Sequence, residues 1–118
     1  SPHMDPAVIV EAKWKMMSCV PGVATPTEAF AAIHAGADGL KLFPAQVVSP
    51  GVVKALRAVL PPKTILLPVG GITPGEMAEY FAAGADGFGL GSELFKLDYS
   101  VDEIRQRAQR FVAAARRP

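Results

Sequence analysis

A pattern of eight residues occurs twice in this chain, and it restricts the fold more than any other feature. AGADGLKL at 35–42 returns as AGADGFGL at 83–90, and the same offset places the Thr-Pro at 25–26 on the Thr-Pro at 73–74. Each copy joins the end of an expected helix to a short apolar run. The repeat therefore predicts two matching units of strand and helix.

Helix starts are marked by a capping residue followed by proline. Such pairs stand at 5–6, 25–26, 49–50 and 73–74. The side-chain oxygen of the first residue accepts a free backbone N–H, and a proline at the first helical position needs no N–H of its own. TPTE at 25–28, TPGE at 73–76 and SVDE at 100–103 add a glutamate three residues after the cap. These three capping boxes predict helices that begin at 26, 74 and 101.

Short apolar runs without strong alternation lie between the helices, as in parallel strands that are buried on both faces. We expect strands near 18–23, 38–43, 64–69 and 86–91. Because strand alternates with helix, the chain is predicted to be an α/β protein, and the repeat favours an eight-stranded TIM barrel, (βα)8. The alternative is an open parallel sheet that uses one type of αβ turn twice.

The length of the chain fits only part of such a barrel. A complete barrel needs about 200 to 250 residues, whereas this chain has 118 and supplies four strands. We therefore expect residues 1–118 to form a single half-barrel. Its open edges and interior require a second half, other copies of the chain, or a longer protein.

Composition and charge exclude several classes of function. Half of the residues are apolar and the net charge is +1, with no apolar stretch of the roughly 20 residues needed to cross a bilayer. We expect a cytoplasmic protein that binds neither membranes nor nucleic acids, since the C-terminal arginines interleave with apolar residues on a solvated helix face. These arginines are Arg105, Arg107, Arg110, Arg116 and Arg117. Cys19 is the only cysteine, so neither a disulfide framework nor a metal site is expected, and no cofactor.

Lys41 is the residue that most directly suggests chemistry. It stands between Leu40 and Leu42, and if these leucines face the helices, then Lys41 and Phe43 face the barrel interior. A lysine in an apolar, partly enclosed space loses solvation, which favours the neutral amine that forms a Schiff base with a carbonyl. The alternative is a structural lysine that pairs with a carboxylate or extends to water.

Glycines follow the last two expected strands. In VGGIT at 69–73 and LGSEL at 90–94, glycines allow backbone N–H groups to approach an anion, and the helix that follows adds a favourable dipole. TIM barrels often bind phosphate in the loops after strands 7 and 8. The predicted phosphate ligands are Gly70, Gly71, Gly91 and Ser92, and the glycines at 87, 89 and 91 are expected to leave open space beside Lys41.

Four segments resemble the C-terminal half of the 2-keto-3-deoxy-6-phosphogluconate and 6-phosphogalactonate aldolases. They are SPHMDPAVI at 1–9, PGVATPTEAFAAIHAGADGLKLFPA at 21–45, PVGGITP at 68–74 and GFGLGSELF at 87–95. The sequence ATPTEAFAA at 24–32 resembles the phosphogalactonate branch more than the phosphogluconate branch. The resemblance implies a (βα)8 barrel, generally a homotrimer, and a class I aldolase that needs no metal.

Carried over to this chain, the resemblance makes Lys41 the Schiff-base lysine and places the phosphate at Gly70, Gly71 and Ser92. Pro2 and Phe43 match residues that line the substrate pocket. The implied reaction cleaves a 2-keto-3-deoxy-6-phospho sugar acid to pyruvate and glyceraldehyde 3-phosphate. The proton-transferring glutamate and a phosphate-contacting arginine belong to earlier strands in the family, so this half alone is expected to turn over poorly if at all.

Two other functions compete with the aldolase. The first is a phosphate-binding half-barrel that serves as a scaffold or assembly partner without catalysis. Its function would not depend on Lys41. The second is a relative of thiamine phosphate synthase, which would not need a lysine inside this strand. The sequence alone does not decide between the gluconate and galactonate configurations.

Overall fold

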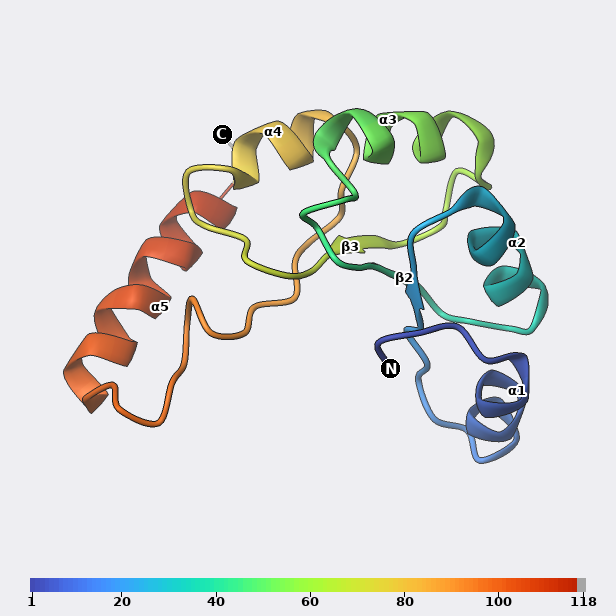
Figure 1. Ribbon diagram of the computed structural model, residues 1–118, viewed down its shortest axis with the longest axis horizontal. Helices are drawn as coiled ribbons and strands as arrows, with labels where there is room; N and C mark the ends of the chain where they lie inside the picture. The colour runs from blue at the N-terminus through green and yellow to red at the C-terminus, as the bar shows by residue number, and fades with distance from the viewer. Residues whose placement is uncertain (117–118) are drawn as a thin grey trace.

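The structure is a computed structural model, and it describes residues 1–116 (Figure 1). Helices and strands alternate along most of the chain, which confirms the predicted α/β class. The elements are α1 (Pro6–Trp14), β1 (Gly22–Val23), α2 (Pro26–His34), β2 (Leu40–Leu42), α3 (Pro50–Val59), β3 (Leu66–Pro68), α4 (Met77–Ala82) and α5 (Val101–Ala115).

The three strands form one parallel sheet in the order β1-β2-β3. Gly22 of β1 pairs with Lys41 of β2, and Lys41 pairs in turn with Leu67 of β3. The expected fourth strand at 86–91 is reduced to a single parallel bridge between Val69 and Gly89. The chain therefore presents four strand positions in sequence order, three of them as regular strands.

The strands are shorter than the sequence predicts, for reasons that lie in the residues themselves. Pro21 has no backbone N–H, so it interrupts the ladder just before β1, although its carbonyl still accepts from the Lys41 N–H at 2.9 Å. In the run at 86–91, every second residue from Gly87 onward is a glycine. Glycine contributes no side chain to a strand, so this edge run pairs only at Gly89.

Most of the predicted helix starts are confirmed. The Asp5 carboxylate accepts the Ala7 N–H, Thr25 and Glu28 complete a capping box, and the Ser100 hydroxyl accepts from Glu103. α3 begins at Pro50 as expected, but Ser49 makes no capping hydrogen bond with its side chain.

The start predicted at 74 is wrong, because α4 begins at Met77. The Thr73 hydroxyl donates to the Glu76 carboxylate at 2.6 Å, instead of accepting from the Glu76 backbone. The Glu76 N–H closes a turn on the Thr73 carbonyl at 3.2 Å. Gly75 lies inside this turn, and glycine disfavours a helix, so the helical pattern starts only after it.

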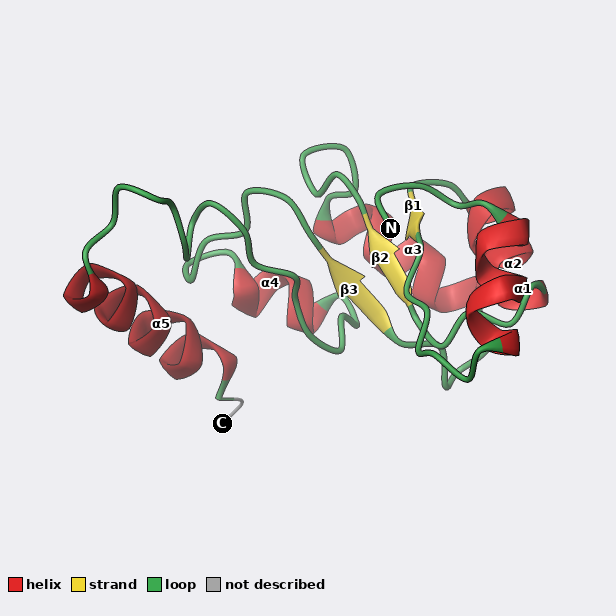
Figure 2. Cartoon of the chain, turned by 90° about the horizontal axis from the view of Figure 1, so that it is seen from below, coloured by secondary structure: helices red, strands yellow, loops and turns green. Residues whose placement is uncertain are grey.

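Helices cover one face of the sheet, and the core lies beneath them. Figure 1 shows α2, α3 and α4 along one side of the strands, while Figure 2 shows α1 and α2 at one end of the sheet and α5 at the other. Leu40, Leu42 and Leu66 are fully buried on the covered face. Among residues 1–116, no helix combines the length and apolar character needed to cross a membrane.

The two copies of the repeat make the same contact. The Asp38 carboxylate accepts the Cys19 N–H at 2.7 Å and pairs with Lys13 of α1 at 2.7 Å. The Asp86 carboxylate accepts the Leu66 N–H at 2.8 Å and pairs with Arg57 of α3 at 2.6 Å. Each aspartate thus ties the start of one strand segment to the preceding one and to a helix.

Some apolar side chains lie outside this core. Trp14 ends α1, and Met16 and Met17 follow it, with exposed fractions of 85%, 94% and 57%, so these side chains do not pack on the sheet. On α5, Arg105 pairs with Asp102 and Arg107 with Glu103, as expected of a solvated helix face. Arg117 lies outside the described residues.

The contact of Asp38 predicts an acid-dependent loss of stability. The hydrogen bond from Lys13, followed by that from the Cys19 N–H, lowers the pKa of Asp38. Its contribution is therefore complete above the unfolded value of about 3.9 and is lost as the pH falls through the lower folded pKa. We expect Asp38→Asn to lower the urea midpoint at neutral pH, and this difference from the wild type to shrink in acid, as the pH falls through the lowered folded pKa.

Asp98→Asn is the control, because Asp98 is exposed and makes no ion pair within residues 1–116. It should leave the midpoint unchanged at both pH values. A midpoint difference for Asp38→Asn that is as large in acid as at neutral pH would contradict the assignment.

Candidate active site

Lys41 lies on the face of β2 that the helices leave uncovered. Its neighbours Leu40 and Leu42 are fully buried on the opposite face, whereas Lys41 itself is partly exposed. This is the orientation that the alternation of a strand predicts. Since Lys41 sits between Gly22 and Leu67 in the register of the sheet, a small residue and an apolar residue flank it.

The Lys41 ammonium lies 4.3 Å from the centre of the Phe43 ring. Both side chains come from the same strand end, two residues apart, so they share one face. None of the ion pairs within residues 1–116 involves Lys41. The structural alternative, a lysine held by a carboxylate, thus finds no support within the described residues, and the enclosure that the sequence led us to expect is incomplete in this chain.

The loop after β2 carries Phe43 against the loop after β3. The Phe43–Pro44 peptide is cis, and the Ala45 N–H donates to the Val69 carbonyl at 2.8 Å. From the other side, the buried Tyr80 hydroxyl lies 3.2 Å from the carbonyls of Ala45 and Val48. Burial raises the pKa of Tyr80, so its hydroxyl remains a neutral donor to this loop.

Gly70 and Gly71 form the turn that follows β3, with φ values of +114° and +66°. Glycine adopts such angles without strain. A Cβ atom on Gly71 would lie 2.8 Å from Gln46 Nε2, and one on Gly70 would lie 3.2 Å from Gln46 Oε1. The Gln46 carboxamide therefore covers the turn.

Gln46 is a residue that the sequence reasoning missed. It follows Lys41 by five positions, and no motif marks it. Only the parallel pairing of β2 with β3 brings its loop over the diglycine turn. A search for polar residues in the loop next to the expected phosphate site would have found it.

Pro2 lies beside β1. A Cβ atom on Gly22 would come within 2.2 Å of the Pro2 carbonyl oxygen, and the Ser1 amino group reaches the Val20 carbonyl at 3.4 Å. Because Gly22 pairs with Lys41, Pro2 stands one strand position away from the lysine. The glycine at 22 is what permits this close approach.

Gly91 and Ser92 are exposed and lie beyond the bridge at Gly89. The Gly91 carbonyl accepts the N–H groups of Leu94 and Phe95, so the segment turns here, and nothing lies within 4 Å of a Cβ placed on Gly91. The structure thus places the Lys41 ammonium beside the Phe43 ring, and that ring beside Gly70. Gly71 lies under the Gln46 carboxamide, while Gly91 and Ser92 occupy the next loop along.

The space expected beside the glycines at 87 and 89 is filled. A Cβ on Gly87 would meet Leu67 Cδ2 at 3.2 Å, and one on Gly89 would meet Val69 Cγ2 at 2.5 Å. Side chains of the neighbouring strand segment lean over both positions. The prediction of open space is therefore wrong at Gly87 and Gly89, and the space around Gly91 is that of an exposed loop.

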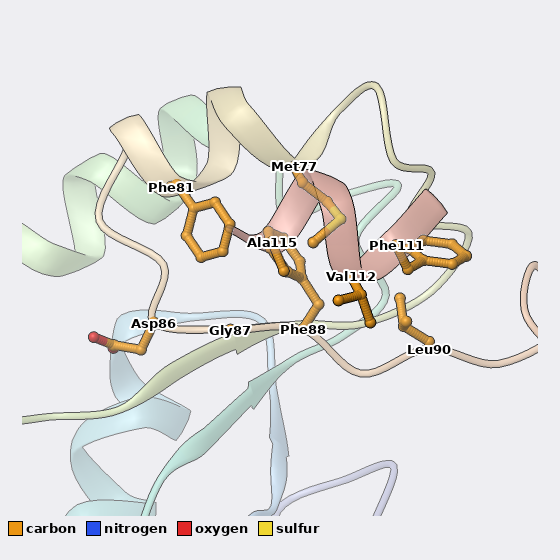
Figure 3. Close-up of a pocket in the computed structure, with 9 residues that line it drawn as sticks. All are labelled: Met77, Phe81, Asp86, Gly87, Phe88, Leu90, Phe111, Val112 and Ala115. Carbon is orange, nitrogen blue, oxygen red and sulfur yellow. The ribbon is translucent and has the colours of Figure 1, made fainter. Parts of the chain in front are cut away.

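An apolar cavity of about 520 Å³ lies elsewhere, between α4, α5 and the segment at 86–90 (Figure 3). Phe81 and Phe88 meet there edge to face, with ring centres 4.9 Å apart. None of the predicted site residues lines this cavity. Within residues 1–116, no three His, Cys, Asp or Glu side chains are grouped to hold a metal ion.

Known proteins resemble this chain along almost its whole length. A family model described as KDPG and KHG aldolase matches residues 1–109. The chain belongs to this aldolase family. A probable 2-dehydro-3-deoxy-6-phosphogalactonate aldolase of Rhizobium meliloti (strain 1021) is 50% identical over 97% of this chain and 54% of its own length.

The 2-dehydro-3-deoxy-6-phosphogalactonate aldolase of Escherichia coli (strain K12) is 44% identical over 98% of this chain and 57% of its own length. A solved structure described as native KDPGal superposes with a TM-score of 0.94 at 44% identity, over 97% of this chain and 55% of that one. The aldolase-family chain thus spans about half the length of the curated relatives that it matches.

The anchoring of the loop after β2 is testable at Tyr80. Tyr80→Phe leaves the carbonyls of Ala45 and Val48 without their side-chain donor, so we expect a loss of about 1 to 2 kcal/mol in the free energy of unfolding. Tyr99→Phe is the matched control, since Tyr99 is the only other tyrosine and contacts Lys96 and Arg107 through its ring. Equal losses for both variants, measured by urea unfolding, would contradict the anchoring role.

Proposed function

We propose that this chain carries the Schiff-base side of a class I aldolase active site, with Lys41 as the nucleophile. One observation carries the proposal: in an aldolase-family chain, Lys41 occupies the uncovered face of β2 without a carboxylate partner in residues 1–116 and next to the Phe43 ring. A neutral lysine amine attacks a carbonyl carbon and forms a Schiff base.

The proposed reaction is the cleavage of a 2-keto-3-deoxy-6-phospho sugar acid. The Lys41 amine adds to the C2 ketone and water leaves, which forms an iminium ion. This ion accepts the electron pair of the C3–C4 bond as that bond breaks and the C4 hydroxyl loses its proton, releasing glyceraldehyde 3-phosphate. Protonation of C3 and hydrolysis of the imine then release pyruvate. The names of the two curated relatives favour the galactonate configuration.

The phosphate of this substrate is assigned to the loops after β3 and after the bridge at Gly89. Gly70 and Gly71 offer backbone N–H groups in a turn that only glycine adopts easily, and Gly91 and Ser92 extend the site. Phe43 lies between this end and Lys41, and Pro2 lines the pocket on the β1 side of Lys41. The substrate is thus recognised at its phosphate and reacts at its ketone.

The four strand positions are proposed to be the C-terminal half of a TIM barrel, with residues 1–118 as one unit. Glu28 accepts from the Ala24 and Thr25 N–H groups, and Glu76 binds Thr73, so both carboxylates already have partners. Glu93 lies beyond the bridge at Gly89, in the loop that carries Gly91 and Ser92, and is the weaker candidate within this chain. The group that transfers the proton to C3 is therefore assigned to a segment outside this chain, either a second half or another copy in a homo-oligomer.

A non-catalytic phosphate-binding scaffold is the second candidate, and the partial exposure of Lys41 favours it. A nucleophilic lysine is usually activated by desolvation or by a neighbouring cation, and desolvation is limited on this open face. The two functions differ in one property of Lys41, because only the aldolase requires its amine to form an imine.

Borohydride trapping tests the aldolase function directly. When the chain is incubated with pyruvate and reduced, we expect one covalent adduct, located on Lys41 by peptide mass spectrometry. Lys41→Ala should abolish the adduct, because the nucleophile is removed. Lys54→Ala is the matched control, since Lys54 is an exposed helix lysine, and it should leave adduct formation unchanged.

The outcome separates the two functions. A folded wild-type chain without an adduct on Lys41 would favour the scaffold. Adducts spread over several lysines would show unselective chemistry and would contradict a built site.

The half-barrel is testable by mass in solution. The sheet within residues 1–116 is open at β1, and an unpaired strand edge is a template for association with another chain. Light scattering behind size exclusion should therefore give a mass that exceeds the 12.4 kDa of a single chain. A folded monomer of 12.4 kDa over a wide concentration range would contradict the need for a partner.

A further inference from the structure

We propose that Gln46 selects phosphorylated ligands, by donating a hydrogen bond from its carboxamide to a phosphate bound at the Gly70–Gly71 turn. The proposal rests on the proposed function and adds a residue that determines specificity. Gln46 lies in the loop between β2 and α3, on the same strand end as Lys41 and Phe43. It thus stands between the proposed nucleophile and the proposed phosphate loop.

The position of the carboxamide is the first observation. Gln46 Nε2 and Oε1 lie 2.8 and 3.2 Å from the points where Gly71 and Gly70 would carry a Cβ atom. Phe43 Cδ2 lies 3.7 Å from the same point on Gly70. One continuous surface therefore runs from the Lys41 ammonium over the Phe43 ring to the diglycine turn, and Gln46 covers its far end.

The second observation is that the carboxamide is available. Gln46 is exposed, and its carboxamide takes part in none of the side-chain hydrogen bonds within residues 1–116. A carboxamide carries two N–H donors, and a phosphate oxygen is an acceptor. Gln46 is thus a free donor beside a turn that already presents backbone N–H groups.

The third observation is that the backbone beneath Gln46 is held in place. The neighbouring Ala45 donates to Val69 and accepts from Tyr80, which also reaches Val48. Both sides of the residue are therefore anchored to the core, and a donor on an anchored loop loses less freedom when a ligand binds. A side chain that only filled space would need no such support.

The experiment is a titration of the ¹⁵N-labelled full chain with glycerol 3-phosphate and with inorganic phosphate, followed by NMR. We expect the side-chain NH₂ signal of Gln46, assigned by its loss in Gln46→Ala, to shift together with the backbone signals of Gly70 and Gly71. Gln106 and Gln109 are internal controls, because they are exposed on α5, and their NH₂ signals should not move.

The variants report on the energetics. Gln46→Ala should weaken phosphate-ester binding about tenfold, which is the scale of one hydrogen bond to a charged group. Gln46→Glu should weaken it further, because a carboxylate repels a phosphate dianion. Val47→Ala is the matched control from the same loop, since Val47 is 64% exposed, and its affinity should equal that of the wild type.

Three results would overturn the assignment: equal affinity in the Gln46 variants, shifts at the diglycine turn without a shift at Gln46, or no binding by the folded wild type. Pyruvate trapping on the same wild-type sample reports separately on the aldolase function. An adduct on Lys41, together with equal phosphate-ester binding by the Gln46 variants and the wild type, would contradict only the role of Gln46. A Gln46-dependent phosphate site without an adduct sinks the aldolase.

Discussion

The contact between an aspartate and the start of the preceding strand segment is the constraint on which the rest of this structure depends. Asp38 binds the Cys19 N–H, and Asp86 binds the Leu66 N–H. Each contact sets how far one segment slides along its neighbour, and each is reinforced by a cation on a helix, Lys13 or Arg57. Because a parallel sheet has no hairpin turn to set its register, these side-chain contacts perform that task in both copies of the repeat.

Once the register is set, the place of Lys41 follows from the period of a strand. Burial of Leu40 and Leu42 against the helices leaves the residue between them on the other face. The parallel direction then brings the ends of β2 and β3 to the same edge, so the loop with Phe43 meets the turn of Gly70 and Gly71. The parallel pairing of β2 with β3 thus assembles the candidate site, and few direct side-chain contacts are needed.

The sequence predicted well what local rules determine. The capping box at Thr25, the α/β order and the orientation of Lys41 each depend on residues within a few positions of one another. What it missed depends on neighbours distant in sequence. Val69 fills the space at Gly89, and Gln46 covers the diglycine turn. The late start of α4 at Met77 is the exception, because it follows from Gly75 inside TPGE itself.

The same distinction separates the place of Lys41 from its reactivity. Its face is decided by Leu40 and Leu42, which are adjacent in the chain, so this chain alone is enough to orient the side chain. Its desolvation requires apolar groups on the uncovered side of the sheet, where residues 1–116 provide the Phe43 ring at 4.3 Å. The solvation of the Lys41 amine depends on all protein groups that lie within several ångströms of it. A second half or a neighbouring copy would therefore change how readily Lys41 reacts without changing where it lies.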